Sequence, residues 1–202
     1  MAEGVIKFNC IWLEEGIEVG EKELSELNHL RNSLLEYDLI GVDANGFGYG
    51  NLSVRIDEGK SFLVTGSQTA HIKELSDNQL SLVTDYNIDI NELSCKGMTK
   101  ASSESLTHAA IYQSLPSVRY VIHIHSIDLW QRLFNIHPTT PESAEYGTKE
   151  LALAVAKLSK EVGKQKLLVL GGHREGIIFY GDSYEEILEY THTVIDRLQA
   201  LK

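Results

Sequence analysis

The segment at residues 118–125 constrains the fold more than any other part of the chain. It is a nearly unbroken run of apolar and β-branched side chains, and it ends in His123-Ile124-His125. A continuous apolar run of this kind is typical of a strand that is buried on both faces of a sheet. Such a strand needs cover on both sides, which indicates a layered fold with helices around a central sheet.

The rest of the chain supplies the helices and strands that a layered fold needs. Leucines at helical spacing predict a helix at residues 21–37, and alternating apolar and polar residues predict a half-buried strand at 51–56. The other expected strands lie at residues 8–13, 61–65, 80–84, 87–93, 118–124, 167–170 and 177–180. The other expected helices lie at residues 103–115, 127–134 and 149–161, and a last one begins after Ser183. Because repeats and linkers are absent from the sequence, we expect one α/β domain over residues 1–202, with α/β/α layers around a mixed, mostly antiparallel sheet.

The charge balance narrows the classes of partner. The chain carries 18 Lys and Arg against 29 Asp and Glu, a net charge of -11, which argues against nucleic acid as a partner. A small phosphorylated substrate remains compatible, because backbone N–H groups and hydroxyls can bind a phosphate. No segment has the roughly 20 consecutive apolar residues that a membrane span requires. The two cysteines, Cys10 and Cys95, are far apart in the sequence and suggest no disulfide framework, so we expect a cytoplasmic protein.

Two histidines at the end of the buried strand are the first candidate ligands. Side chains two positions apart on a strand point to the same side of the sheet, so His123 and His125 can converge on one metal ion. Imidazole nitrogen is a common ligand of zinc and similar ions. By itself the pair is equally compatible with structural histidines that form hydrogen bonds near a strand end, so a third ligand is required.

His173 and Glu104 extend the candidate set, although each has a simpler explanation. His173 lies in a glycine-flanked turn between two expected strands, where the backbone can bring a side chain over the end of the sheet. An exposed loop histidine would look the same in the sequence. Glu104 lies where a helix should begin, a position at which a carboxylate can simply interact with the helix dipole. Taken singly, both residues therefore leave their roles open.

Several short motifs, in a fixed order, resemble the class II aldolase/adducin family. The motifs are Gly50-Asn51-Leu52-Ser53, Val64-Thr65-Gly66, Ser102-Ser103-Glu104, His123-x-His125 and the glycine-flanked His173. The family includes fuculose-phosphate and rhamnulose-phosphate aldolases, ribulose-phosphate 4-epimerase and methylthioribulose-phosphate dehydratase. The resemblance runs from about residue 24 to 200 and is densest between residues 102 and 126. Agreement of several motifs in order is more specific than any one of them.

The resemblance implies a metal enzyme that acts on a small phosphorylated substrate. It implies Zn²⁺ bound by His123, His125 and His173, with Mn²⁺ or Co²⁺ as alternatives, and Glu104 as the catalytic carboxylate and a further ligand. The implied phosphate pocket consists of Gly50, Asn51, Thr65, Gly66, Ser102 and Ser103. The implied reaction is that of an aldolase-type lyase, which cleaves or forms a carbon–carbon bond through a metal-stabilised enediolate. The resemblance also implies a homotetramer with active sites at subunit interfaces.

The chain departs from the family pattern in three places. Arg174 and Glu175 stand between His173 and Gly176, where relatives read His-Gly. The loop at residues 67–71 reads Ser-Gln-Thr-Ala-His in place of a Pro-Ser-Gly-like run. The stretch at residues 135–147 is shorter than in the sugar-phosphate aldolases, where it helps to shape the sugar pocket. These differences bear on the third ligand, the phosphate site and the substrate.

Other activities of the same family are alternatives to the lyase. A sugar-phosphate epimerase or dehydratase would use the same metal site, and an adducin-like protein would bind without catalysis. Glu104 favours the aldolase branch over the epimerase branch, which resembles Ser-Ser-Asp at this point. His108, Tyr112 and Tyr146 are candidates for a proton donor, with packing or a structural hydrogen bond as the other interpretation.

Overall fold

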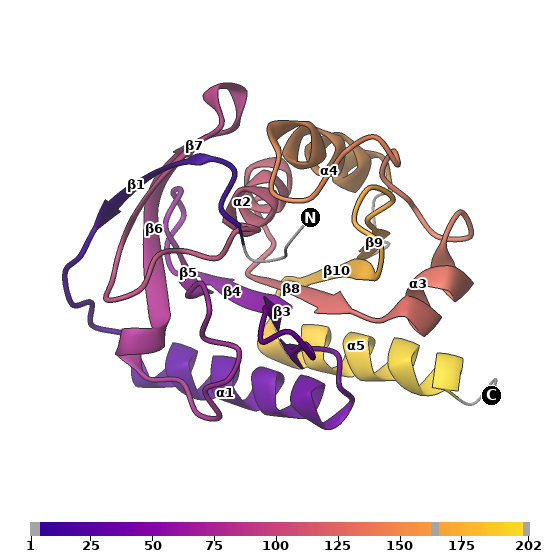
Figure 1. Ribbon diagram of the computed structural model, residues 1–202, viewed down its shortest axis with the longest axis horizontal. Helices are drawn as coiled ribbons and strands as arrows, with labels where there is room; N and C mark the ends of the chain where they lie inside the picture. Colours follow the sequence, from indigo (N-terminus) through magenta and orange to yellow (C-terminus); the bar gives the residue numbers. More distant parts are fainter. Residues whose placement is uncertain (1–4, 163–165, 200–202) are drawn as a thin grey trace.

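The computed structural model describes residues 5–162 and 166–199, and an eight-stranded sheet runs through its centre (Figure 1). The strands lie in the order β1-β7-β6-β5-β4-β8-β10-β9. Their bounds are β1 (Asn9–Leu13), β4 (Asn51–Arg55), β5 (Phe62–Thr65), β6 (Leu80–Asn87), β7 (Glu92–Lys96), β8 (Tyr120–His125), β9 (Leu167–Val169) and β10 (Gly176–Gly181). Only the β1–β7 pair is parallel among these neighbours. The prediction of a mixed, mostly antiparallel sheet is confirmed.

Helices cover both faces of the sheet. In the described part of the chain they are α1 (Glu21–Glu36), α2 (Ser105–Ser114), α3 (Ile127–Leu133), α4 (Lys149–Glu161) and α5 (Tyr184–Gln199). Helices α2 and α4 lie on one face, and α1 and α5 lie on the other (Figure 1). Each face has its own apolar core, so the layered α/β/α prediction is confirmed. None of these helices combines the length and the apolar character that a bilayer span requires.

Strand β8 lies in the middle of the sheet, as its apolar sequence predicts. All of its residues are buried. Val121 packs in the core beneath α2 and α4, whereas Ile122 and Ile124 pack in the core beneath α1 and α5. Because side chains alternate along a strand, His123 and His125 lie on the same face as Val121. The histidine pair therefore points toward the layer that contains α2.

The expected strand at residues 87–93 is wrong. Strand β6 continues to Asn87, a short 3₁₀ turn (Ile88–Ile90) follows, and β7 begins only at Glu92. The Asn87 side chain accepts a hydrogen bond of 3.1 Å from the backbone N–H of Asp89, and Asn91 adopts a left-handed φ of 53°. Asparagine favours such local hydrogen bonds and conformations over the hydrogen bonds of a strand. The turn between Asn87 and Asn91 interrupts the strand for that reason.

Cys10 and Cys95 are distant in the sequence but neighbours in the fold. Because β1 pairs with β7, their Sγ atoms lie 3.8 Å apart as free thiols. The hydrogen bond with the Cys10 thiol lowers the pKa of Cys95 to about 6. The contact depends on a parallel pairing between the two strands, which the spacing of the cysteines does not reveal.

A buried hydrogen-bond network joins β4 to α2. The Ser53 hydroxyl lies 2.7 Å from Nδ1 of His108 and 2.7 Å from the Tyr112 hydroxyl. Burial lowers the pKa of His108 to about 3, so its imidazole is neutral at neutral pH. These buried contacts support a structural role for His108 and Tyr112.

We expect Ser53→Ala to lower the free energy of unfolding by about 1–3 kcal/mol, because the change leaves buried polar groups of His108 and Tyr112 without this partner. Urea unfolding monitored by circular dichroism measures the loss. Ser33→Ala is the matched control, since the Ser33 hydroxyl only donates to the Leu30 carbonyl of its own helix. The control should change stability by less than about 0.5 kcal/mol. Equal losses in the two variants would count against the network.

Candidate metal centre

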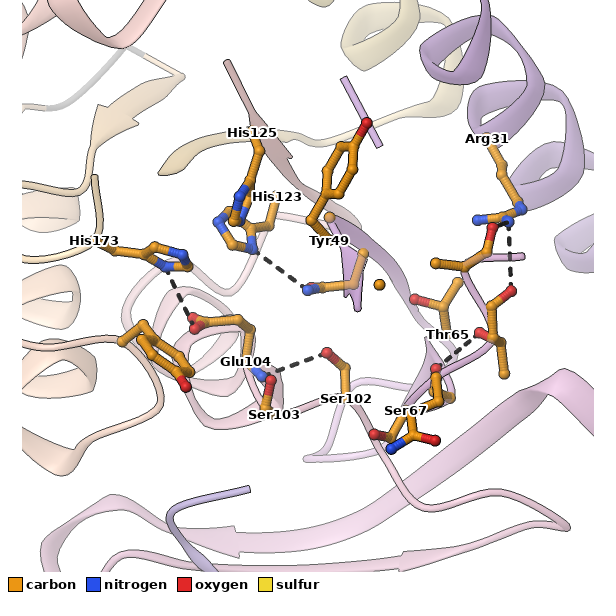
Figure 2. Close-up of a pocket in the computed structure, with 18 residues that line it drawn as sticks. Arg31, Tyr49, Thr65, Ser67, Ser102, Ser103, Glu104, His123, His125 and His173 are labelled. Atoms are coloured by element: carbon orange, nitrogen blue, oxygen red, sulfur yellow. Dashed lines mark hydrogen bonds and ion pairs between the residues drawn. The ribbon is translucent and has the colours of Figure 1, made fainter. Parts of the chain in front are cut away.

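Three histidines from two parts of the chain meet at one end of β8 (Figure 2). His123 and His125 come from β8 itself, and their ring centroids are 4.8 Å apart. Strand β10 pairs with β8 so that Gly176 lies opposite His125, and the turn before β10 carries His173. The His173 ring centroid is 5.0 Å from that of His123 and 4.7 Å from that of His125. The three imidazoles thus form a compact cluster.

The turn that carries His173 depends on its two glycines. A Cβ atom at Gly171 or Gly172 would collide with the backbone of the segment at residues 140–144, which packs directly against the turn. Glu175 adopts a left-handed φ of 80° just before β10 begins. The turn therefore accommodates Arg174 and Glu175, and His173 still reaches the other two histidines.

The cluster fits a divalent metal ion in its chemistry. Each histidine offers one nitrogen, these atoms lie within 4.8 Å of one another, and all three residues are buried. Burial lowers the pKa of His123 well below its usual value, and the neighbouring His125 and His173 add to the effect. His123 is therefore neutral at neutral pH, which is the form that binds metals.

Asn51 orients His123 from the neighbouring strand. The two residues lie opposite each other on β4 and β8, and Nδ2 of Asn51 is 3.3 Å from Nδ1 of His123. Nε2 of His123 and Oδ1 of Asn51 are both buried without a hydrogen-bond partner. If the amide is rotated by half a turn, Oδ1 accepts the Nδ1–H hydrogen bond, and Nε2 is left with a free lone pair. A bound ion would satisfy that nitrogen, as a hydrogen-bonded histidine ligand requires.

Glu104 lies beside the histidines at the N-terminus of α2. Its Oε1 is 3.6 Å from Nδ1 of His173, and its Oε2 accepts a hydrogen bond of 3.0 Å from the Thr107 hydroxyl. The side chain is only 3% exposed. An interaction with the helix dipole alone would not require contact with His173. A carboxylate in this place can balance the charge of a divalent ion or exchange a proton with a bound molecule.

The residues expected to bind phosphate line one pocket together with Glu104 and the three histidines. They are Gly50, Asn51, Thr65, Gly66, Ser102 and Ser103. The pocket is open to solvent on one side, and its empty space, including that open part, is about 520 Å³.

The backbone N–H of Gly66 is already in use. It donates to the Gln79 carbonyl at 2.8 Å, so it is not available to a phosphate. A Cβ atom at Gly66 would collide with the Thr99 side chain, and close packing accounts for the glycine at this position. Among the residues expected to bind phosphate, the hydroxyls and the Asn51 amide are therefore better placed as donors than the Gly66 backbone.

The structure adds pocket residues that the sequence interpretation missed. Arg31 comes from α1, and Tyr49 comes from a small hairpin of β2 (Gly41–Val42) and β3 (Gly48–Tyr49). The Tyr49 ring lies 5.6 Å from that of His125. The sequence does indicate that Arg31 is buried, because it stands four residues after Leu27 on the apolar stripe of α1. The sequence gives no comparable signal for Tyr49.

Tyr146 lies against the third histidine. It lines the pocket, and its ring centroid is 5.0 Å from that of His173. Nζ of Lys7 lies 3.7 Å from the centroid of the Tyr146 ring and donates a hydrogen bond of 2.9 Å to the Tyr146 carbonyl. These contacts place the N-terminal segment and the 140–148 loop at the edge of the histidine cluster, and Tyr146 packs there as an aromatic wall.

Comparison with solved structures identifies relatives of this fold. L-fuculose-1-phosphate aldolase from Thermus thermophilus is 20% identical, with 90% of this chain and 93% of that chain covered and a TM-score of 0.66. The putative aldolase/epimerase/decarboxylase YgbL from Klebsiella pneumoniae is also 20% identical, with 91% and 90% covered and a TM-score of 0.65. A sugar-phosphate aldolase from Thermotoga maritima is 16% identical, with 89% and 93% covered and a TM-score of 0.66. At these identities the likeness establishes the fold. A search of curated proteins finds no match.

A family model gives the stronger assignment. The model of the class II aldolase and adducin N-terminal domain matches residues 39–201. This range contains the histidine cluster, Glu104 and the expected phosphate-binding residues. Class II aldolases are metal-dependent, in agreement with a cluster of three buried histidines. Because the match covers most of the chain, this protein belongs to the class II aldolase and adducin family.

Proposed function

We propose that this protein is a zinc-dependent lyase that cleaves or forms a carbon–carbon bond in a small phosphorylated hydroxy-carbonyl compound. The observation that carries the proposal is the arrangement of one pocket. Three buried imidazoles and the Glu104 carboxylate lie at one end, and hydroxyl and amide groups line the other. The printed names of two structural relatives, a fuculose-phosphate aldolase and a sugar-phosphate aldolase, support this class of substrate.

Each group in the pocket has a part in the proposed reaction. His123, His125 and His173 would hold the ion, which when bound supplies Lewis-acid polarisation of a carbonyl and an adjacent hydroxyl. In the bond-forming direction, a Glu104 oxygen accepts a proton from the carbon next to the carbonyl. Thr107 fixes the carboxylate by donating to Oε2, so that Oε1 faces the histidines. This fixed orientation lowers the entropic cost of the proton transfer.

The far end of the pocket would position the substrate. The hydroxyls of Thr65, Ser102 and Ser103 and the Asn51 amide can donate hydrogen bonds to phosphate oxygens. A phosphate held there leaves the carbonyl end of a short sugar directed toward Glu104 and the histidines. Binding energy from the phosphate would then serve to orient the reacting carbons.

Product identification tests this proposal. Purified protein is first analysed for bound metal and then incubated with a panel of ketose phosphates, and the products are identified by NMR and mass spectrometry. A lyase gives two shorter carbonyl compounds. A single product of unchanged mass would identify an epimerase, and loss of water a dehydratase, and either would replace the lyase while retaining the metal site. Absence of both a stoichiometric ion and any product would identify an adducin-like binding protein.

A further inference from the structure

Arg31 is a buried cation on a helix face that is otherwise apolar. The buried residues of α1 are Leu27, Leu30, Arg31 and Leu34, and Arg31 is only 2% exposed. A guanidinium group in such a place costs free energy unless its charge is compensated. Burial lowers the pKa of Arg31, which reflects this desolvation. A leucine would pack the same position at no such cost, so the charge needs an explanation.

The protein compensates the charge of Arg31 only in part. Nη2 donates to the carbonyls of Thr69, Ala70 and Ile72, at 3.5, 2.8 and 2.6 Å. Nε is buried and has no hydrogen-bond partner. Within residues 5–162 and 166–199, no carboxylate forms an ion pair with the guanidinium. The carbonyl groups accept hydrogen bonds from one nitrogen of the guanidinium, whereas a bound anion would also balance its positive charge.

Arg31 lies where an anion bound in the pocket could reach it. Arg31 lines the pocket at the side of Thr65 and Ser67, away from the three histidines (Figure 2). It is the only Lys or Arg among the described residues that line this pocket. The protein as a whole carries a net charge of -11, so little positive charge is available elsewhere to attract an anion.

We propose that Arg31 supplies the positive charge that binds the substrate phosphate at the Thr65 end of the pocket. The loop carbonyls occupy Nη2, and the Nε–H edge of the guanidinium is left for a phosphate oxygen. Arg31 would thus make the site selective for phosphorylated over uncharged compounds, which the hydroxyls alone could not do. The inference rests on the proposed function for the nature of the substrate, but it makes its own prediction about phosphate binding.

Inorganic phosphate is the direct probe, used with the metal-loaded full chain. Titration of ¹⁵N-labelled wild-type protein is expected to shift the Arg31 Nε–H resonance, because phosphate becomes its hydrogen-bond partner. Arg31→Gln should weaken phosphate binding, measured by calorimetry, by about 10–100-fold, the value of hydrogen bonds to a charged group. Arg31→Lys keeps the charge but loses the planar fork, so it should recover part of the affinity. Arg132→Gln in α3, whose arginine pairs with Asp128, is the matched control and should bind phosphate normally.

A purely structural role for Arg31 predicts different results. In that case phosphate would bind to wild type and Arg31→Gln equally, or would bind wild type without moving the Nε–H resonance, and either result overturns the proposal. Failure of wild type to bind phosphate would overturn it too. The resonance shift is measured in wild type, so it remains decisive if a variant does not fold. Phosphate binding that depends on Arg31, without conversion of any sugar phosphate, would refute the proposed lyase and leave this inference standing.

Discussion

Replacing His123 by alanine is expected to yield a folded protein that purifies with far less than one metal ion per chain. The reason is that the change removes one of three buried ligand nitrogens, so that only His125 and His173 remain. Turnover of the substrate should fall by about 10³-fold or more, since Lewis-acid stabilisation by the ion contributes several kcal/mol. Metal content by inductively coupled plasma mass spectrometry and steady-state kinetics measure the two effects.

The matched control for this change is His29→Ala. His29 is an exposed histidine outside the cluster and outside the pocket, so the control should retain full metal content and activity. Circular dichroism and thermal unfolding confirm that both variants are folded. Undiminished metal and turnover in the folded His123→Ala variant would exclude the cluster as the catalytic metal site.

Replacing Glu104 by glutamine is expected to lower kcat by about 10²–10⁴-fold, the usual contribution of a general acid or base. Glutamine has nearly the same shape, and its amide cannot accept the proton that the carboxylate accepts. The three histidines remain, so most of the metal should be retained. Comparison of kcat and metal content in the same preparation separates the loss of proton transfer from the loss of the ion.

Thr107→Val gives a graded companion to this variant. The valine keeps the shape of threonine but removes the hydrogen bond of 3.0 Å to Glu104, so kcat should fall by about 10-fold or more. Thr107→Ser restores a hydroxyl and should recover most of the activity. If Glu104→Gln retained wild-type turnover, Glu104 would not be the proton-transfer group, and Tyr146, the other candidate beside the cluster, would be tested next.

The parts of the fold that are encoded locally could be predicted from the sequence. The apolar run of β8 and the leucine spacing of α1 can be recognised in the sequence itself. Helix α4 spans the residues over which its helical apolar pattern extends. The parallel pairing of β1 with β7 could not be predicted, because nothing in the sequence of either strand indicates which strand lies next to it. The difference at residues 87–93 has a local cause: polar and apolar side chains alternate there as in a strand, but the turn between Asn87 and Asn91 interrupts it.

Part of the candidate site could also be predicted from the sequence. The spacing of His123 and His125 indicates convergence on one face of a strand. The order of motifs that resembles the class II aldolase/adducin family adds His173 and Glu104 to the same site. The contacts around them depend on packing between distant segments. Thr107 reaches Glu104 by helical spacing, but nothing in the sequence shows that the carboxylate turns toward His173. Arg31 meets the pocket only because α1 packs against the loop at residues 69–72.

The most direct test of the metal site is a crystal structure of the purified protein with anomalous diffraction data on both sides of the metal absorption edge. The arrangement predicts one strong anomalous peak between the imidazoles of His123, His125 and His173, at about 2.0–2.1 Å from a nitrogen of each if the ion is zinc. A peak elsewhere, or an empty cluster in protein that is fully active, would contradict the metal centre.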